Sequence, residues 1–203
     1  MKKFFATHSY NMVKMFLNQF AIAIFGFTLV LATQKAGNVL LRNLTSVFAI
    51  AFYLFLIYTM TWEIGYKDRI SVELGKRKAQ PWTGVLIALC ANVPNFLLAL
   101  WMMMTQICGW VQTPATLASG FLNGMYMGLL ANKIGEVTLS SHWFIFILTP
   151  LPAIVAAGLA YAMGLKDLRL TKLSDPIVPE SDREPRSKKR TWSSYKDNND
   201  KSE

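Results

Sequence analysis

The apolar residues of this sequence are gathered into long blocks, and this distribution constrains the fold more than any other feature. Four blocks cover residues 16–32, 47–60, 85–104 and 144–165, and a weaker fifth covers 117–131. A hydrocarbon core about 30 Å thick is crossed by roughly 20 apolar residues of helix, which the four strong blocks reach with their mildly polar flanks. None alternates as a barrel strand would, so only helices satisfy their backbone groups in lipid. We predict an all-α, polytopic membrane protein with four transmembrane helices.

The lysines and arginines outside the apolar blocks predict how these helices are oriented. Basic residues close to a span are retained on the cytoplasmic side of a membrane. Four spans with both termini in the cytoplasm place twelve such residues inside and three outside, whereas the best arrangement of five spans places nine inside and six outside. We therefore expect a multi-pass protein of the cell membrane, in which 117–131 forms a short re-entrant or interfacial helix at the outer face.

The C-terminal part differs in composition from the rest of the chain. Residues 166–203 contain three prolines, ten basic and eight acidic residues, and too few apolar residues to bury a core. We predict a helical membrane bundle over 1–165 and a disordered cytoplasmic tail over 166–203. Four basic residues of the tail are candidates for contact with anionic lipid, with a solvated tail as the alternative: Arg186, Lys188, Lys189 and Arg190.

The first apolar block could belong to a signal peptide or to a retained membrane anchor. Lys2 and Lys3 precede the block, which ends in Val30, Leu31 and Ala32, a sequence that could pass for a signal-peptide cleavage site. The polar segment before the block is long, however, and Asn18 and Gln19 interrupt the expected apolar stretch. These features favour a retained anchor over a cleaved peptide.

Small residues recur at every fourth position in two segments. Such spacing puts them on one stripe of a helix, where the lack of side-chain bulk lets another backbone approach closely in a membrane. We predict helix-packing faces at both stripes, the second able to match the first, with a pore lining as the alternative for the glycines. The residues are Gly120, Gly124 and Gly128 in the weak block, and Ala156, Ala160 and Gly164 in the last one.

The third block contains the best candidate for an internal polar site. At 100° per residue, Asn92, Asn95 and Gln106 lie within about 60° of one another and opposite an apolar face. Pro94 cannot donate a hydrogen bond to the carbonyl four residues earlier, so the helix should bend beside the two asparagines. These four residues could hold a polar solute. The alternative is that the amides form hydrogen bonds to other helices.

Charged residues follow the second block and predict local structure at the cytoplasmic side. The pairs Glu63 with Lys67 and Arg69 with Glu73 stand four residues apart, the spacing at which opposite charges meet on a helix. We expect both ion pairs, and we expect residues 65–80 to form a short helix lying at the membrane surface.

The sequence lacks the residue sets that common membrane-embedded chemistries require. His8 and His142 lie on opposite sides of the predicted membrane, and Cys90 and Cys108 are separated by about 27 Å of helix, too far to bond. There is no HExxH motif, no pair of intramembrane carboxylates and no phosphate-binding glycine loop. We expect no catalytic residues, no metal and no cofactor. The net charge of +9 comes largely from residues that flank spans, which argues against a nucleic-acid partner.

These features favour a non-catalytic subunit or assembly partner of a larger membrane complex, in contact with the lipid bilayer and with other membrane proteins or copies of itself. An oligomeric transporter or channel for a small polar solute is the alternative, and a membrane-embedded enzyme is a second alternative. Four helices are too few to enclose a wide path, so transport would require an oligomer.

Overall fold

The protein is described by a computed structural model that covers residues 2–76, 78, 80–109 and 112–168. Helices make up 84% of it, which confirms the predicted all-α class. Three helices are each long and apolar enough to cross a membrane: Phe4–Lys35, Val39–Glu73 and Trp143–Leu165. A bent pair, Thr83–Ala91 with Val93–Cys108, raises the number to four when the pair is counted as one span. These helices fit a membrane protein.

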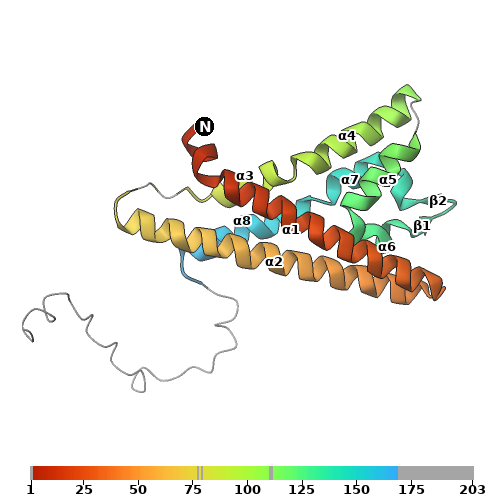
Figure 1. The fold of residues 1–203 in the computed structure, drawn as a ribbon, viewed down its shortest axis with the longest axis horizontal. Helices are drawn as coiled ribbons and strands as arrows, with labels where there is room; N and C mark the ends of the chain where they lie inside the picture. Colours follow the sequence, from red (N-terminus) through yellow and green to blue (C-terminus); the bar gives the residue numbers. More distant parts are fainter. Residues whose placement is uncertain (1, 77, 79, 110–111, 169–203) are drawn as a thin grey trace, which may run out of the picture. The chain divides into compact units, whose positions relative to one another are not determined.

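The first two helices form a long antiparallel hairpin. α1 (Lys2–Lys35) and α2 (Val39–Glu73) run across the bundle and meet at the turn that joins them (Figure 1). Gly37 in this turn has a φ of 67°, a left-handed conformation that glycine adopts without a Cβ penalty. Asn38 then caps α2 by accepting hydrogen bonds from two amides of its first turn. With 34 and 35 residues, each helix is about 50 Å long and exceeds the thickness of a hydrocarbon core.

α2 continues through the first half of the segment 65–80, which we expected to form a separate surface helix. Lys67 Nζ lies 2.6 Å from Glu63 Oε1, and Arg69 Nε lies 2.7 Å from Glu73 Oε1. Both predicted ion pairs are therefore confirmed. Because these pairs join successive turns and no proline intervenes, the helix extends without a break to Glu73.

The third apolar block is broken near its middle. α3 (Thr83–Ala91) and α4 (Val93–Cys108) meet at Asn92 with a bend of 50°. The bend predicted beside Pro94 is confirmed. Pro94 lies in the first turn of α4, where its missing N–H leaves no helical hydrogen bond unmade. α4 consequently diverges from α1 beyond the bend (Figure 1).

The segment 117–131 is not one helix, which corrects our expectation of a single glycine stripe. α5 (Gln112–Leu122) is followed by the 3₁₀ turn η1 (Gly124–Tyr126) and the short α6 (Met127–Leu130). Asn123 stands at the break: its side-chain amide donates to the Ser119 carbonyl at 2.9 Å. Asparagine competes for backbone hydrogen bonds in this way and tends to end helices. The three glycines therefore lie in three different elements.

A small β-hairpin and the last span complete the bundle. β1 (Lys133–Ile134) pairs antiparallel with β2 (Val137–Thr138), with Ile134 opposite Val137. The turn η2 (Leu139–Ser141) leads into α7 (Trp143–Leu148) and α8 (Leu151–Leu165). The interruption between these two helices falls at Thr149 and Pro150.

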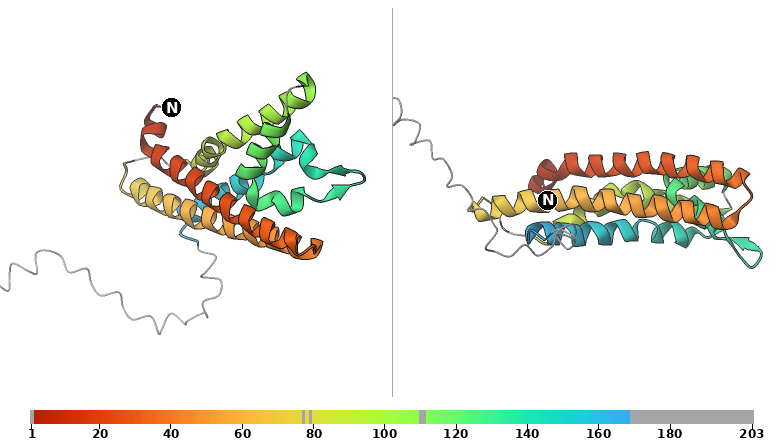
Figure 2. Two further views of the ribbon diagram at one scale, coloured as in Figure 1. Left: turned by 45° about the vertical axis from the view of Figure 1, so that its right-hand side comes forward. Right: turned by 90° about the horizontal axis from the view of Figure 1, so that it is seen from below.

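α8 packs against both α2 and α3, with glycines at the closest contacts (Figure 2). Gly65 of α2 lies against the backbone of Tyr161, and Gly84 of α3 lies against Tyr161 and the Ala157 carbonyl. Gly164 of α8 lies against the Trp62 carbonyl. A Cβ at any of these glycines would overlap atoms of the neighbouring helix, so glycine is what permits backbones to pack this closely.

One compact unit of the chain comprises Met1–Leu168. Its core is apolar and includes the fully buried side chains of Tyr53, Ile57, Ile87, Met102 and Phe146. Residues 169–203, which contain most of the predicted tail, lie outside the described part of the chain.

Candidate functional site

Polar side chains lie at both ends of the bundle and at one point between them. We call the end where α2 and α8 finish and α1 and α3 begin the basic end, because Lys67, Lys76 and Lys78 lie there. The opposite end, where α1 finishes, α2 begins and β1 and β2 lie, is called the hairpin end. Each predicted site residue can be placed relative to these two ends.

Asn92 and Asn95 form a buried amide pair where α3 meets α4. Their exposed fractions are 0% and 2%, so both side chains face the interior of the bundle. The Asn95 side-chain amide donates to Asn92 Oδ1 at 2.8 Å, and that of Asn92 donates to the Ala88 carbonyl at 2.8 Å. Among the described residues, none donates to Asn95 Oδ1. The two amides thus bond within their own broken helix, and Pro94 stands beside them in the same turn.

Gln106 does not join this pair, which corrects its grouping with the asparagines. It is exposed near the end of α4, and its amide donates to the Ser141 carbonyl in η2. Eleven residues of helix separate it from Asn95 by about 16 Å along the axis. A helical projection compares only the directions of side chains around the helix axis and ignores their separation along it. Residues on one stripe can therefore be grouped into one site although they lie far apart.

The small residues of the two predicted packing faces contact different neighbours. Gly124 lies against Ala23 of α1, and Gly128 lies against Ser46 of α2. Gly120 faces only the flexible side chain of Met127, whose sulfur would stand 3.2 Å from an added Cβ. On α8, which packs on α2, the three positions differ in burial: Ala156 is half-buried, whereas Ala160 and Gly164 are buried.

At the basic end, side chains from four helices surround a small cavity. Tyr161 of α8 is 2% exposed and donates its hydroxyl hydrogen to Asp68 Oδ2 of α2 at 2.8 Å. The cavity of about 40 Å³ beside this bond is also lined by His8 of α1, Thr83 of α3 and Lys78. That volume can hold a water molecule, and the lining offers several polar partners for one. The arrangement ties the ends of the helices together through polar groups.

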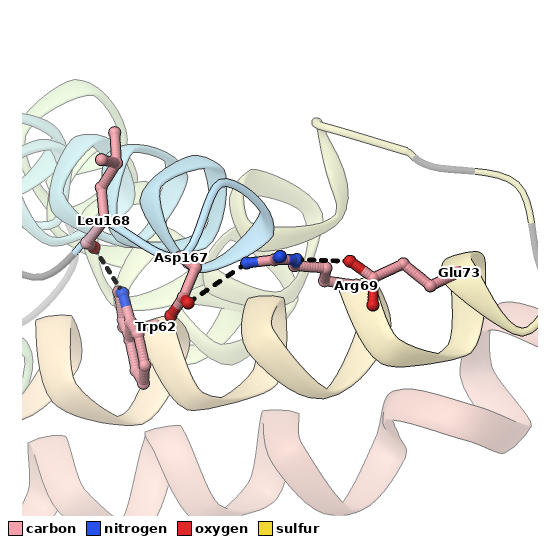
Figure 3. Close-up of polar contacts among 5 residues, drawn as sticks. All are labelled: Trp62, Arg69, Glu73, Asp167 and Leu168. Carbon is pink, nitrogen blue, oxygen red and sulfur yellow. Dashed lines mark hydrogen bonds and ion pairs between the residues drawn. The ribbon is translucent and has the colours of Figure 1, made fainter. Parts of the chain in front are cut away.

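The last residues of the compact unit are bound to α2 by a second set of polar contacts (Figure 3). Arg69 lies between two carboxylates, Glu73 on its own helix and Asp167 just past α8, with its Nη1 at 3.3 Å from Asp167 Oδ2. The indole N–H of Trp62 donates to the Leu168 carbonyl at 2.7 Å. Exposed ion pairs of this kind contribute at most about 1 kcal/mol, so they position the end of α8 more than they stabilise the fold.

Two larger cavities open at the basic end. One of about 290 Å³ lies between α1 and α2, where Lys14 and Lys67 stand with Glu63. The other, of about 800 Å³, lies between the first turns of α1 and the start of α3. Both cavities are large enough for a small molecule, and both are lined by charged groups.

No protein-family model, curated protein or solved structure matches this chain. Among the described residues, no group of three or more His, Cys, Asp and Glu side chains could hold a metal ion. The tail residues predicted to contact anionic lipid lie outside the described part of the chain: Arg186, Lys188, Lys189 and Arg190.

Sequence reasoning missed the polar cluster at the basic end. His8, Asp68 and Tyr161 belong to three helices, and no local pattern links them. Asp68 is one of many charged residues in its segment. Tyr161 lies near the end of an apolar block, where aromatic residues are common in membrane proteins. The close helix contacts at Gly65 and Gly84 were also missed, because each is a single glycine that belongs to no repeat.

Proposed function

We propose that this protein spans the cytoplasmic membrane four times, with α3 and α4 forming one broken span and both termini in the cytoplasm. The basic end is then cytoplasmic, in agreement with the positive-inside rule. The chain from α5 to α6 forms a re-entrant hairpin at the outer face. In support of this, Gln106 near the end of α4 bonds to Ser141, and Arg42 at the start of α2 donates to Asn132 just after α6, at 2.8 Å.

We further propose that it acts as a non-catalytic subunit or assembly partner of a larger membrane complex. The observation that carries this proposal is the amide pair, because Asn92 and Asn95 bond to each other and to the Ala88 carbonyl and so have a structural role. This weakens the transport alternative at the site that suggested it. The close glycine contacts between helices support a rigid scaffold rather than a moving carrier.

The surface of α4 is the proposed contact with a partner. α4 packs against α5 and α7 and leaves apolar side chains exposed on its other side, among them Leu97 (59%), Leu100 (51%) and Ile107 (70%). Beyond the bend, α4 runs away from α1 (Figure 2). We expect a helix of a neighbouring membrane protein to pack along this apolar side of α4. In the absence of a partner, lipid would cover it.

The proposal is tested by purification from native membranes in a mild detergent. A photocrosslinking amino acid at Leu100 should capture a different membrane protein in a fixed ratio, while the same amino acid at Leu159, exposed on α8, should capture much less. Mass spectrometry identifies the captured protein.

Recovery of the protein only with itself would contradict the assembly role. If such an oligomer in liposomes passes urea or glycerol, measured by osmotic light scattering, and Asn92→Leu abolishes the flux in a folded protein, transport replaces the proposed role. Equal capture from Leu100 and Leu159 would remove α4 as the contact face.

A further inference from the structure

The cavity of about 800 Å³ at the basic end is amphipathic along its length. Its polar part is lined by Lys76, Lys78 and Gln80, which precede α3. Its apolar part is lined by Leu86 and Cys90 on successive turns of α3, together with Phe4 and Phe5 on α1. From the start of α3 to Cys90 the helix descends about 10 Å. The cavity therefore runs from a basic opening to an apolar floor between two helices.

The lysines that line this cavity give it a positive charge. Two lysines line it, and none of its lining residues is acidic, in contrast to the neighbouring cavity between α1 and α2, which contains Glu63 and Asp68. Both lysine side chains are exposed, and neither forms an ion pair with another of the described residues. An anionic group at the opening would meet ammonium groups without a competing carboxylate in the lining.

The height of the cavity in the membrane is indicated by aromatic side chains. Trp82 immediately precedes α3 and is 72% exposed. Trp62 and Tyr66 stack on each other near the same end of α2, with ring centroids 5.3 Å apart. Tryptophan and tyrosine settle at the headgroup level of a bilayer. The basic opening is thus at the level of lipid phosphates, and the apolar floor is at the level of the first acyl carbons.

We infer that this cavity binds an anionic phospholipid, with its phosphate at Lys76 and Lys78 and the start of its acyl chains along Leu86 and Cys90. A volume of about 800 Å³ is suitable for a headgroup and the upper part of the chains. The remainder of the chains would continue into the bilayer beside α3. The inference rests on the membrane placement in the proposed function and is independent of the assembly role.

The inference is tested by native mass spectrometry of the full-length protein in detergent, titrated with phosphatidylglycerol or with phosphatidylcholine. The first phosphatidylglycerol molecule to bind should do so more tightly than the first phosphatidylcholine molecule. The double variant Lys76→Gln, Lys78→Gln should weaken phosphatidylglycerol binding about twenty-five-fold, because each basic side chain near an anionic group contributes about five-fold. The matched control is Lys35→Gln, Lys133→Gln, which removes the same charge at the hairpin end and should leave the affinity unchanged.

A second variant separates a built site from general attraction to charge. Leu86→Trp fills the apolar floor at a side chain that is 45% exposed, so the fold should be retained, as checked by circular dichroism and gel filtration. It should weaken phosphatidylglycerol binding although both lysines remain.

Three outcomes would overturn the inference. Equal affinity for the two lipids would remove the role of charge, and unchanged affinity in the double lysine variant would place the lipid elsewhere. Displacement of phosphatidylglycerol by excess inorganic phosphate, together with an unchanged affinity in Leu86→Trp, would show a site for free phosphate and not for a lipid. None of these outcomes depends on whether a protein partner exists.

Discussion

The amides of Asn92 and Asn95 lie inside an apolar bundle, where a polar group without a partner is costly. Asn92 is the centre of the pair, since it both donates to Ala88 and accepts from Asn95. Asn92→Leu would leave the Asn95 amide without this acceptor. We expect it to lower the free energy of unfolding by about 1–2 kcal/mol, a range that combines the cost of an unpaired buried group with the modest strength of side-chain hydrogen bonds in membranes.

The double variant Asn92→Leu, Asn95→Leu removes both polar side chains and should be more stable than Asn92→Leu alone. Replacing both partners of a buried bond by apolar groups of similar size can be nearly neutral. Thermal unfolding in detergent measures both variants. Additive losses in the double variant would mean that the two amides do not act as a pair.

The hydroxyl group of one residue, Tyr161, forms a hydrogen bond that joins α8 to α2. Tyr161→Phe removes the hydrogen bond to Asp68 and leaves the ring in place. We expect a loss of about 1.5–3 kcal/mol in unfolding free energy, the usual contribution of a bond to a charged group. Tyr10→Phe, at a side chain that is 73% exposed, is the control and should have no effect. Equal melting temperatures for both variants would contradict the prediction.

At the scale of elements, Gly120 of α5 and Gly124 of η1 have unequal roles. An added Cβ at Gly124 would overlap the Ala23 carbonyl of α1, whereas one at Gly120 would meet only the movable Met127 side chain at 3.2 Å. Gly124→Ala should therefore lower stability by about 1–3 kcal/mol, because backbones must separate. Gly120→Ala should be neutral or stabilising, since alanine favours a helix. Melting temperatures measure both, and equal effects would contradict the described packing of α1 against η1.

At the scale of the whole molecule, the two native cysteines allow the topology to be tested. Cys108 is exposed at the end of α4, and Cys90 is half-buried within α3. In a Cys90→Ser variant, a membrane-impermeant maleimide should label Cys108 from outside intact spheroplasts if α3 and α4 together cross the membrane. A Lys78→Cys residue in a background without other cysteines should react only after the membrane is opened. Labelling of both positions from the same side would exclude a span formed by α3 and α4.

Some features of this protein could be predicted from the sequence because their causes are local. The length of the apolar blocks determines helices that fit a membrane, since lipid offers no partner for backbone groups. The bend beside Pro94 follows from a missing N–H, and the ion pair of Arg69 with Glu73 follows from the rise of one helical turn. Each of these depends on residues within one continuous stretch of the chain, and the bend and the ion pair depend on residues only four positions apart.

Other features were decided only by the tertiary structure. Asp68 and Tyr161 are 93 residues apart in the chain, and their bond exists because α8 packs against α2 at Gly65 and Gly164. The separation of Gln106 from the asparagine pair depends on height along α4, and the separate partners of Gly124 and Gly128 depend on the break at Asn123. Spacing along one helix specifies which side chains share a face, whereas the packing of helices determines what that face touches.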